Sequence, residues 1–210
     1  MRHPSSLIRK TPALRLYGRR TVLRPLAVQD FPAWRDVRLR NEAWLVPWEP
    51  QRPPGAADPS RDRVAFEARC AARDRERSVD HAYPFGVFID QQLVGEVNLN
   101  NVTRGALQSA TVGYWIDRDH AGNGYIAEAV VVTMRFAFEQ LQLHRVEVCI
   151  VPRNTNSRRV MEKLDLRCEG LAERFLEIAG TWEDHLRYAI TVEEWDARRD
   201  AHTVQWITGR

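Results

Sequence analysis

Two glycines, Gly122 and Gly124, stand where a polar segment meets an apolar run with helical spacing (TVGYWIDRDHAGNGYIAEA, Thr111–Ala129). The first turn of a helix has unpaired backbone N–H groups and a partial positive charge, so it can bind phosphate oxygens. Glycines let a ligand approach the backbone because they lack a Cβ atom. The segment therefore predicts an anion-binding turn at the start of a helix.

A second polar pair follows the next predicted strand. Asn154 and Ser157 come after His144–Val151 and Pro152, where a short helix is expected to begin. Asn and Ser at such positions cap a helix through hydrogen bonds to its backbone. Two interpretations stay open at this point: the pair only caps the helix, or it also contacts a ligand bound at the glycine turn.

The expected elements that position these groups follow from apolar periodicity and turn residues. In chain order they are a strand Thr21–Leu26, a helix from Asp30, a proline-rich loop Asn41–Ser60, a helix Pro59–Asp80, a hairpin of Pro84–Asp90 and Leu93–Asn101, a strand Ala110–Ile116, a helix from Gly124, a strand His144–Val151, a helix Asn154–Leu164, a hairpin of Arg167–Ile178 and Thr181–Val192, and a helix Glu193–Asp200.

The hairpins require antiparallel pairing, whereas the strand–helix–strand unit across Gly124–Gln140 requires a parallel crossover. The sequence thus predicts an α/β (α+β mixed sheet) domain with about seven strands, mostly antiparallel with a parallel central pair, and four to five helices. We expect one domain over 21–195, a basic N-terminal arm over 1–20, and a helix end with a tail over 196–210.

Composition narrows the class of protein. The chain has 210 residues, 44% hydrophobic and 28% charged, as in soluble globular domains. No run approaches the ~18 apolar residues of a membrane span, and three scattered cysteines favour the reducing cytoplasm over a disulfide framework. The six histidines lack metal-site spacing, so no metal is expected.

The net charge of +3 gives no reason to expect DNA binding. The basic residues of 1–20 (six Lys or Arg, no acid) are either a solvated arm or a contact to ribosomal RNA.

A dinucleotide is one alternative ligand for the glycine turn, because Gly122, Gly124 and Ala127 satisfy the spacing G-x-G-x-x-G/A. That fingerprint should follow the first strand directly, but here Asp117–Ala121 intervene and an antiparallel run precedes it. An acid should also end the next strand, whereas Glu147 lies inside one. The dinucleotide interpretation is therefore disfavoured.

The order of elements and three motifs resemble the GNAT acyltransferase superfamily. These motifs are the glycine turn, similar to that family's pyrophosphate loop Q/R-x-x-G-x-G/A, the segment Asn154–Ser157, similar to N-x-x-[AS], and the helix-to-strand passage LDLRCEGL. Within this superfamily, the chain most resembles the RimJ/RimL branch, which acetylates N-terminal alanines of ribosomal proteins, and it is closest to the RimJ type. The segments that carry this resemblance are GYWI, GYIAEAV, LHRVEV, VPRNTNSRRVMEKL and TWEDHLRYAI.

The resemblance implies acetyl-CoA as co-substrate and the amine of a ribosomal protein N-terminus as acceptor, in a monomer or homodimer. The residues it assigns to coenzyme binding are Val112, Gly113, Tyr114, Trp115, Ile116, Ala121, Gly122, Asn123, Gly124, Tyr125, Ile126, Ala127, Asn154 and Ser157. The chain departs from the pattern at Ala121, which offers no side chain to a phosphate, and at Ile126. The usual tyrosine acid falls on Met161, which leaves Ser157 as the expected acid.

Two acids are candidates for the general base. Glu96 lies between Val94 and Val97 on a predicted core strand, where an unpaired acid would be costly. Glu177 is the second candidate, because its strand closes the acceptor side in the family.

Trp44, Trp48, Asp184 and His185 are candidate acceptor-binding residues, or else anchors of the loop and a buried structural pair. Two other functions stay open: acetylation of a small amine such as an antibiotic or polyamine, and a non-catalytic module that binds acyl-CoA or the ribosome.

Overall fold

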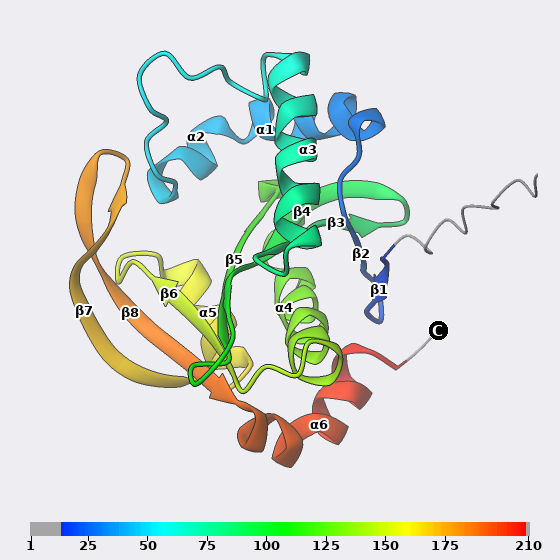
Figure 1. The fold of residues 1–210 in the computed structure, drawn as a ribbon, viewed down its shortest axis with the longest axis vertical. Helices are drawn as coiled ribbons and strands as arrows, with labels where there is room; N and C mark the ends of the chain where they lie inside the picture. Colours follow the sequence, from blue (N-terminus) through cyan, green and yellow to red (C-terminus); the bar gives the residue numbers. More distant parts are fainter. Residues whose placement is uncertain (1–13, 209–210) are drawn as a thin grey trace, which may run out of the picture.

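The seven predicted strands and one short additional strand form an eight-stranded sheet in the computed structural model, which describes residues 14–208 (Figure 1). Their order across the sheet is β1-β2-β3-β4-β5-β6-β8-β7, and every described neighbouring pair except β5–β6 is antiparallel. The strands are β1 (Leu16–Tyr17), β2 (Val22–Arg24), β3 (Tyr83–Ile89), β4 (Gln92–Thr103), β5 (Ser109–Ile116), β6 (Arg145–Ile150), β7 (Arg167–Ile178) and β8 (Thr181–Thr191).

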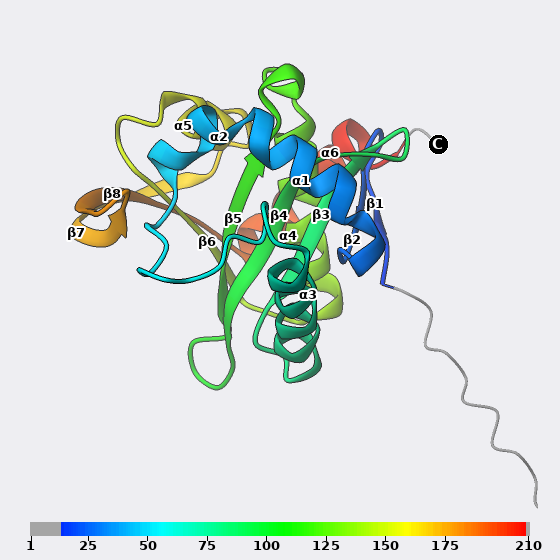
Figure 2. The same ribbon diagram turned by 90° about the horizontal axis from the view of Figure 1, so that it is seen from above.

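Helices cover both faces of the sheet (Figure 2). Helices α1 and α3 pack against β4 and β3 on one face, around a small aromatic core, and α4 packs against β4 and β5 on the other, within the main core. The α-helices are α1 (Phe31–Arg40), α2 (Glu42–Leu45), α3 (Arg63–Ser78), α4 (Tyr125–Arg135), α5 (Thr155–Lys163) and α6 (Val192–Trp206).

The parallel pairing of β5 with β6 is short. Its register runs from Ser109–Arg145 to Thr111–Glu147 and stops there, although β5 continues to Ile116. Residues Val112–Ile116 therefore pair with β4 alone, and the edge of β5 that faces β6 has no partner strand beyond Thr111. This gap in the sheet lies beside the start of α5.

The predicted mixed α/β architecture is confirmed, with three differences in detail. A two-residue strand, β1, precedes the predicted first strand, and the one-turn helix α2 lies inside Asn41–Ser60, predicted as a loop. Helix α6 also continues past the expected Asp200 to Trp206, because Trp195, His202 and Trp206 place one buried face on the core. Residues 1–13 of the predicted N-terminal arm lie outside the described part of the chain.

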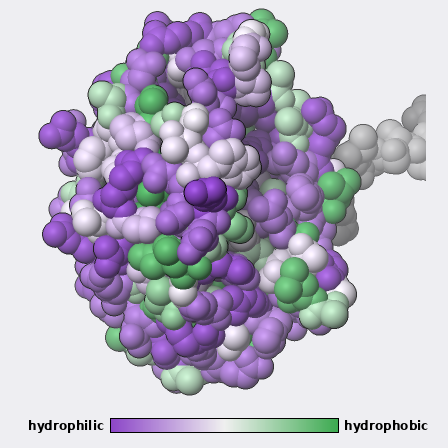
Figure 3. Space-filling view, turned by 90° about the vertical axis from the view of Figure 1, so that its left-hand side faces the viewer, coloured by the Kyte–Doolittle hydropathy of each residue, from purple (hydrophilic) through white to green (hydrophobic). Residues whose placement is uncertain are grey.

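The hairpin of β7 and β8 curves away from the rest of the sheet (Figure 1). The face of the molecule that carries it is mainly hydrophilic, with small separate hydrophobic areas (Figure 3). The tip of the hairpin is tied to the proline-rich segment, since Ala179 N–H donates to the Glu49 carbonyl at 2.9 Å. The hairpin and the proline-rich segment thus close one side of the gap beyond β5.

Asp117 joins the first helices to the glycine turn. Its carboxylate is buried, accepts a hydrogen bond from Asn41 Nδ2 at 2.8 Å, pairs with the Arg40 guanidinium, and lies 3.2 Å from His120 Nδ1. Burial alone would raise the pKa of Asp117, but the hydrogen bonds from Arg40 and Asn41 outweigh it and lower the pKa to about 2. The ionised carboxylate therefore stabilises the fold.

We expect Asp117→Asn to lower the free energy of unfolding by about 2 kcal/mol at neutral pH, because the variant loses the charge that Arg40 pairs. Since the folded pKa lies below the ordinary 3.8, this stabilisation is present above about pH 4 and is lost as the pH falls toward about 2. Urea denaturation of both proteins between pH 7 and pH 3 measures the difference, which should shrink in acid. Asp119→Asn, at an exposed neighbouring residue, is the control; a difference for Asp117→Asn that stays constant with pH would contradict this account.

Candidate active site

A cavity of about 1690 Å³ spans the gap beyond β5. It runs from the glycine turn at the start of α4, along β5 and α5, to the side chains of α1, α3 and the segment between α2 and α3. Its volume exceeds the roughly 300–1,000 Å³ of most small-molecule pockets. The cavity can therefore hold a long ligand and a second reactant.

At one end of the cavity, the glycine turn presents free backbone donors. Gly122 and Gly124 have φ values of +80° and +81°, in the left-handed region that favours glycine, and Gly124 caps α4 without any side-chain hydrogen bond. The first N–H groups of α4 have no partner within the helix. Asn123 braces the turn instead of facing the cavity, since its Nδ2 donates to the carbonyls of His120 and Ala121.

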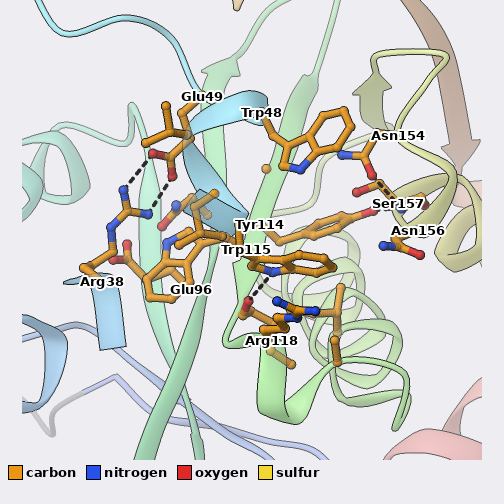
Figure 4. Close-up of a pocket in the computed structure, with 18 of the residues that line it drawn as sticks. Arg38, Trp48, Glu49, Glu96, Tyr114, Trp115, Arg118, Asn154, Asn156 and Ser157 are labelled. Atoms are coloured by element: carbon orange, nitrogen blue, oxygen red, sulfur yellow. Dashed lines mark hydrogen bonds and ion pairs between the residues drawn. The ribbon is translucent and has the colours of Figure 1, made fainter. Parts of the chain in front are cut away.

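In the middle of the cavity, Asn154, Ser157 and Tyr114 lie together (Figure 4). Asn154 Oδ1 accepts the Ser157 N–H at 3.1 Å, so the predicted cap is present, and its Nδ2 makes no hydrogen bond to the described residues. Tyr114 Oη donates to the Ser157 carbonyl at 3.3 Å. Burial raises the pKa of Tyr114, so the phenol stays protonated at neutral pH.

At the other end, the Glu96 carboxylate lines the cavity while being almost fully buried. It accepts hydrogen bonds from Trp34 Nε1 at 2.5 Å and from Arg69 Nη2 at 2.6 Å. An unpaired acid would be costly at this position, and each oxygen of Glu96 has a partner. A carboxylate has about four acceptor sites, so Glu96 can still accept a hydrogen bond from a water molecule.

The other carboxylates that line this end of the cavity also form ion pairs with arginines. Arg38 binds Glu49 through two hydrogen bonds of 2.6 and 2.7 Å, and Figure 4 shows this pair beside Glu96. Glu42 pairs with Arg61, and Asp58 pairs with Arg52. Every carboxylate that lines the cavity therefore has an arginine partner among the described residues.

Both predicted tryptophans line the cavity and also hold its wall. Trp44 Nε1 donates to the Ile116 carbonyl at the end of β5, at 3.2 Å. The Trp48 ring lies 4.7 Å from the Arg153 guanidinium, which pairs with Glu183 of β8. This geometry is thus compatible with both predicted roles of the two tryptophans, as anchors of the loop and as walls of an acceptor pocket.

Five predicted site residues do not line the cavity. Val112 is buried in the core, Asn123 braces the turn, and Glu177 is exposed opposite Trp182 near the hairpin tip. Asp184 accepts the Arg174 N–H, and His185 packs against Phe175. The remaining predicted residues all line it: Trp44, Trp48, Glu96, Gly113, Tyr114, Trp115, Ile116, Ala121, Gly122, Gly124, Tyr125, Ile126, Ala127, Asn154 and Ser157.

The sequence did not single out the basic residues near the glycine turn. Lys163 lines the cavity from the end of α5, and Arg20 reaches the turn from the segment before β2. The helical spacing of α5 could have predicted the position of Lys163, because this residue lies about two turns beyond Thr155, the first residue of the helix. Nothing in the local sequence places Arg20 there, because its position depends on a contact with Glu128, 108 residues away.

The observed features fit the expected coenzyme. Coenzyme A carries phosphates, which suit the uncapped start of α4, and a pantetheine arm with amides. The free edge of β5 offers backbone partners for such amides.

Within residues 14–208, no group of three or more His, Cys, Asp or Glu side chains could hold a metal ion, and none of the helices is long and apolar enough to cross a membrane.

Known proteins share this fold and much of this sequence. Residues 20–167 match the family model described as an acetyltransferase (GNAT) domain. The chain is 36% identical to the probable N-acetyltransferase YjcK of Bacillus subtilis, over 83% of this chain and 96% of the relative. It is 31% identical to the [Ribosomal protein uS5]-alanine N-acetyltransferase of Escherichia coli, over 90% of this chain and 96% of the relative.

A solved structure is similar over nearly the whole chain. The RimJ protein of Mycobacterium smegmatis, solved in complex with CoA-disulfide, superposes with a TM-score of 0.82 at 33% identity, covering 94% of this chain and 96% of that one. The family match over most of the domain, the identities above 30% and this superposition agree with the mixed sheet and the cavity. The chain belongs to the GNAT acetyltransferase family and is an N-acetyltransferase.

Proposed function

We propose that this protein transfers the acetyl group of acetyl-CoA to the N-terminal alanine of a ribosomal protein in the cytoplasm. The name of the Escherichia coli relative supports this substrate class, and the Mycobacterium smegmatis structure, solved with CoA-disulfide, supports the coenzyme. The observation that carries the proposal is a single cavity that joins the uncapped start of α4 to the buried carboxylate of Glu96. A phosphate-bearing acyl donor and an amine can therefore meet in one place.

In the proposed reaction, the free amine attacks the thioester carbonyl, the C–S bond breaks, and the sulfur leaves as a thiolate that takes up a proton. The backbone N–H groups after Gly124 bind the pyrophosphate, and Asn154 Nδ2 donates to the pantetheine arm. Ser157 donates the proton to the leaving sulfur. Glu96 accepts the proton of the ammonium through a water molecule. A carboxylate that acts in this way is a sufficient base, because an α-amino group has a pKa near ~8 and gives up its proton easily.

The end of the cavity that contains Glu96 is called the acceptor end below. Its charges favour a peptide with a single N-terminal amine over a polyamine as the acceptor. A polyamine site needs carboxylates that are free to bind several ammonium groups. Here Glu42, Glu49, Asp58 and Glu96 are each paired with an arginine. A single α-amino group flanked by uncharged side chains suits such a wall, and Trp44 and Trp48 can contact the first residues of the peptide.

Peptides that begin with alanine should be acetylated in preference to small amines. Released thiol and the acetylated product are measured with acetyl-CoA and a panel of peptides that differ only in their first residue, beside spermidine and an aminoglycoside. We expect kcat/KM for the alanine peptides to exceed that for the small amines by at least about tenfold, an energy difference of ~1.4 kcal/mol. Turnover of spermidine alone, or of none of these amines, would contradict the proposal.

Ser157→Ala should lower kcat by about 10²-fold without changing coenzyme affinity, because general acid catalysis contributes roughly that much. The helix cap should survive, since it uses the Ser157 backbone N–H rather than its hydroxyl. Thr155→Ala, on the exposed side of the same turn, is the matched control. A kcat equal to that of the control would show that Ser157 only caps the helix.

Glu96→Gln should lower kcat by about 10²-fold at neutral pH and less at higher pH, where the amine has already lost its proton. The pH dependence of kcat for both enzymes measures this, together with coenzyme affinity as a test of folding. Glu42→Gln, which removes another cavity-lining carboxylate, should leave the pH profile unchanged. If Glu96 only supports Arg69, its replacement will reduce kcat by the same factor at every pH.

A further inference from the structure

We propose that Arg20 and Lys163, which lie outside the glycine turn, bind a phosphate group of coenzyme A at the start of α4. This inference deepens the proposed function and rests on it. The turn itself has Ala121 where the family's loop has Gln or Arg, so it supplies no basic side chain. Backbone N–H groups alone would then face a ligand with several negative charges.

The Arg20 side chain is held in place from within the protein. Glu128 Oε1 accepts the backbone N–H groups of Arg20 and Thr21 and the Thr21 hydroxyl, and Oε2 accepts Arg20 Nε at 2.9 Å. Arg20 Nη1 donates to the Asn123 carbonyl at 3.1 Å, and the guanidinium lies 4.6 Å from the centre of the Tyr125 ring. Nη2 makes no hydrogen bond to residues 14–208 and is free to bind an anion.

Lys163 approaches the same place from the end of α5. Its Nζ lies 5.1 Å from the centre of the Trp206 ring and forms neither an ion pair nor a hydrogen bond with the described residues. A methyl group placed on Gly124 would lie 3.2 Å from Lys163 Nζ and 3.5 Å from Arg20 Nη2. Two cations thus flank one glycine, whose missing Cβ leaves room beside the backbone.

The distribution of charge along the cavity points to the same ligand. The four carboxylates that line it lie at the acceptor end, each paired with an arginine. Arg118, Arg159 and Lys163 line the cavity, and no ion pair joins them to the described residues. Neighbouring cations repel each other, and an anion between them removes this repulsion and adds charge-assisted hydrogen bonds. Phosphate groups of a nucleotide meet this requirement.

One consequence concerns the N-terminal segment. Arg20 belongs to the basic stretch for which the sequence allowed a contact to ribosomal RNA. Its backbone and side chain are bound to Glu128 in the first turns of α4. Arg20 thus contributes to coenzyme binding, and the segment just before β2 becomes part of the coenzyme site.

The test compares Lys163→Met with wild type in titrations of the full-length protein with CoA and with 3′-dephospho-CoA, and with pantetheine by displacement of CoA. We expect CoA to bind about tenfold more weakly to the variant, a change of ~1.4 kcal/mol, and pantetheine to bind equally to both. A loss for CoA alone places Lys163 at the 3′-phosphate, and an equal loss for both nucleotides places it at the pyrophosphate. Arg75→Met, at an exposed position of α3, should bind as wild type does.

Arg20→Met is a second variant, and the readout is again the ratio of CoA affinity to pantetheine affinity, which a general loss of stability does not change. Unchanged CoA affinity in Lys163→Met, or an equal loss for pantetheine, would overturn the inference. Acceptor peptides are absent from these titrations, so failure of acetyl transfer would remove the proposed function while leaving the phosphate contact measurable. A wild-type protein that does not bind CoA would overturn both.

Discussion

The early end of the parallel ladder between β5 and β6 is the constraint on which the cavity depends. Beyond Thr111 and Glu147 the two strands no longer pair, although β5 runs on to Ile116. The unpaired edge must find other hydrogen-bond partners, and the space beside it connects the start of α4 with α1 and α3. Asp117, at the end of β5, then fixes the direction of the chain into the glycine turn through Arg40 and Asn41.

The cavity separates two kinds of charge environment. At the acceptor end, arginines neutralise each carboxylate, so Glu96 is held in place without an excess of negative charge. At the other end, the free donors of α4 lie beside Lys163, which has no acidic partner among the described residues, and beside Arg20, which Glu128 holds in place. In the proposed function, this separation orients a large anionic ligand with its phosphates away from Glu96 and its reactive end near Ser157 and Tyr114.

Much of this architecture could be predicted from the sequence, because it depends on local patterns. Apolar periodicity indicated the strands and α4, and turn chemistry indicated the glycine turn and the cap at Asn154. What depends on distant contacts could not be predicted. The partners of Glu96 come from helices 62 and 27 residues away, and Arg20 is positioned through Glu128. The last turn of α6 likewise lies against the segment that follows β1, since Arg19 N–H donates to the Trp206 carbonyl.

In the proposed complex, one bound coenzyme spans this cavity, with its phosphates at Gly122–Ala127 and its sulfur in the gap between β5 and β6. A crystal structure of the complex with CoA measures this directly. We expect the pyrophosphate oxygens to accept hydrogen bonds from the first N–H groups of α4, and the sulfur to lie between Ser157 and the side of the cavity that carries Glu96. Phosphates bound away from the glycine turn, or a sulfur outside the gap, would contradict the account.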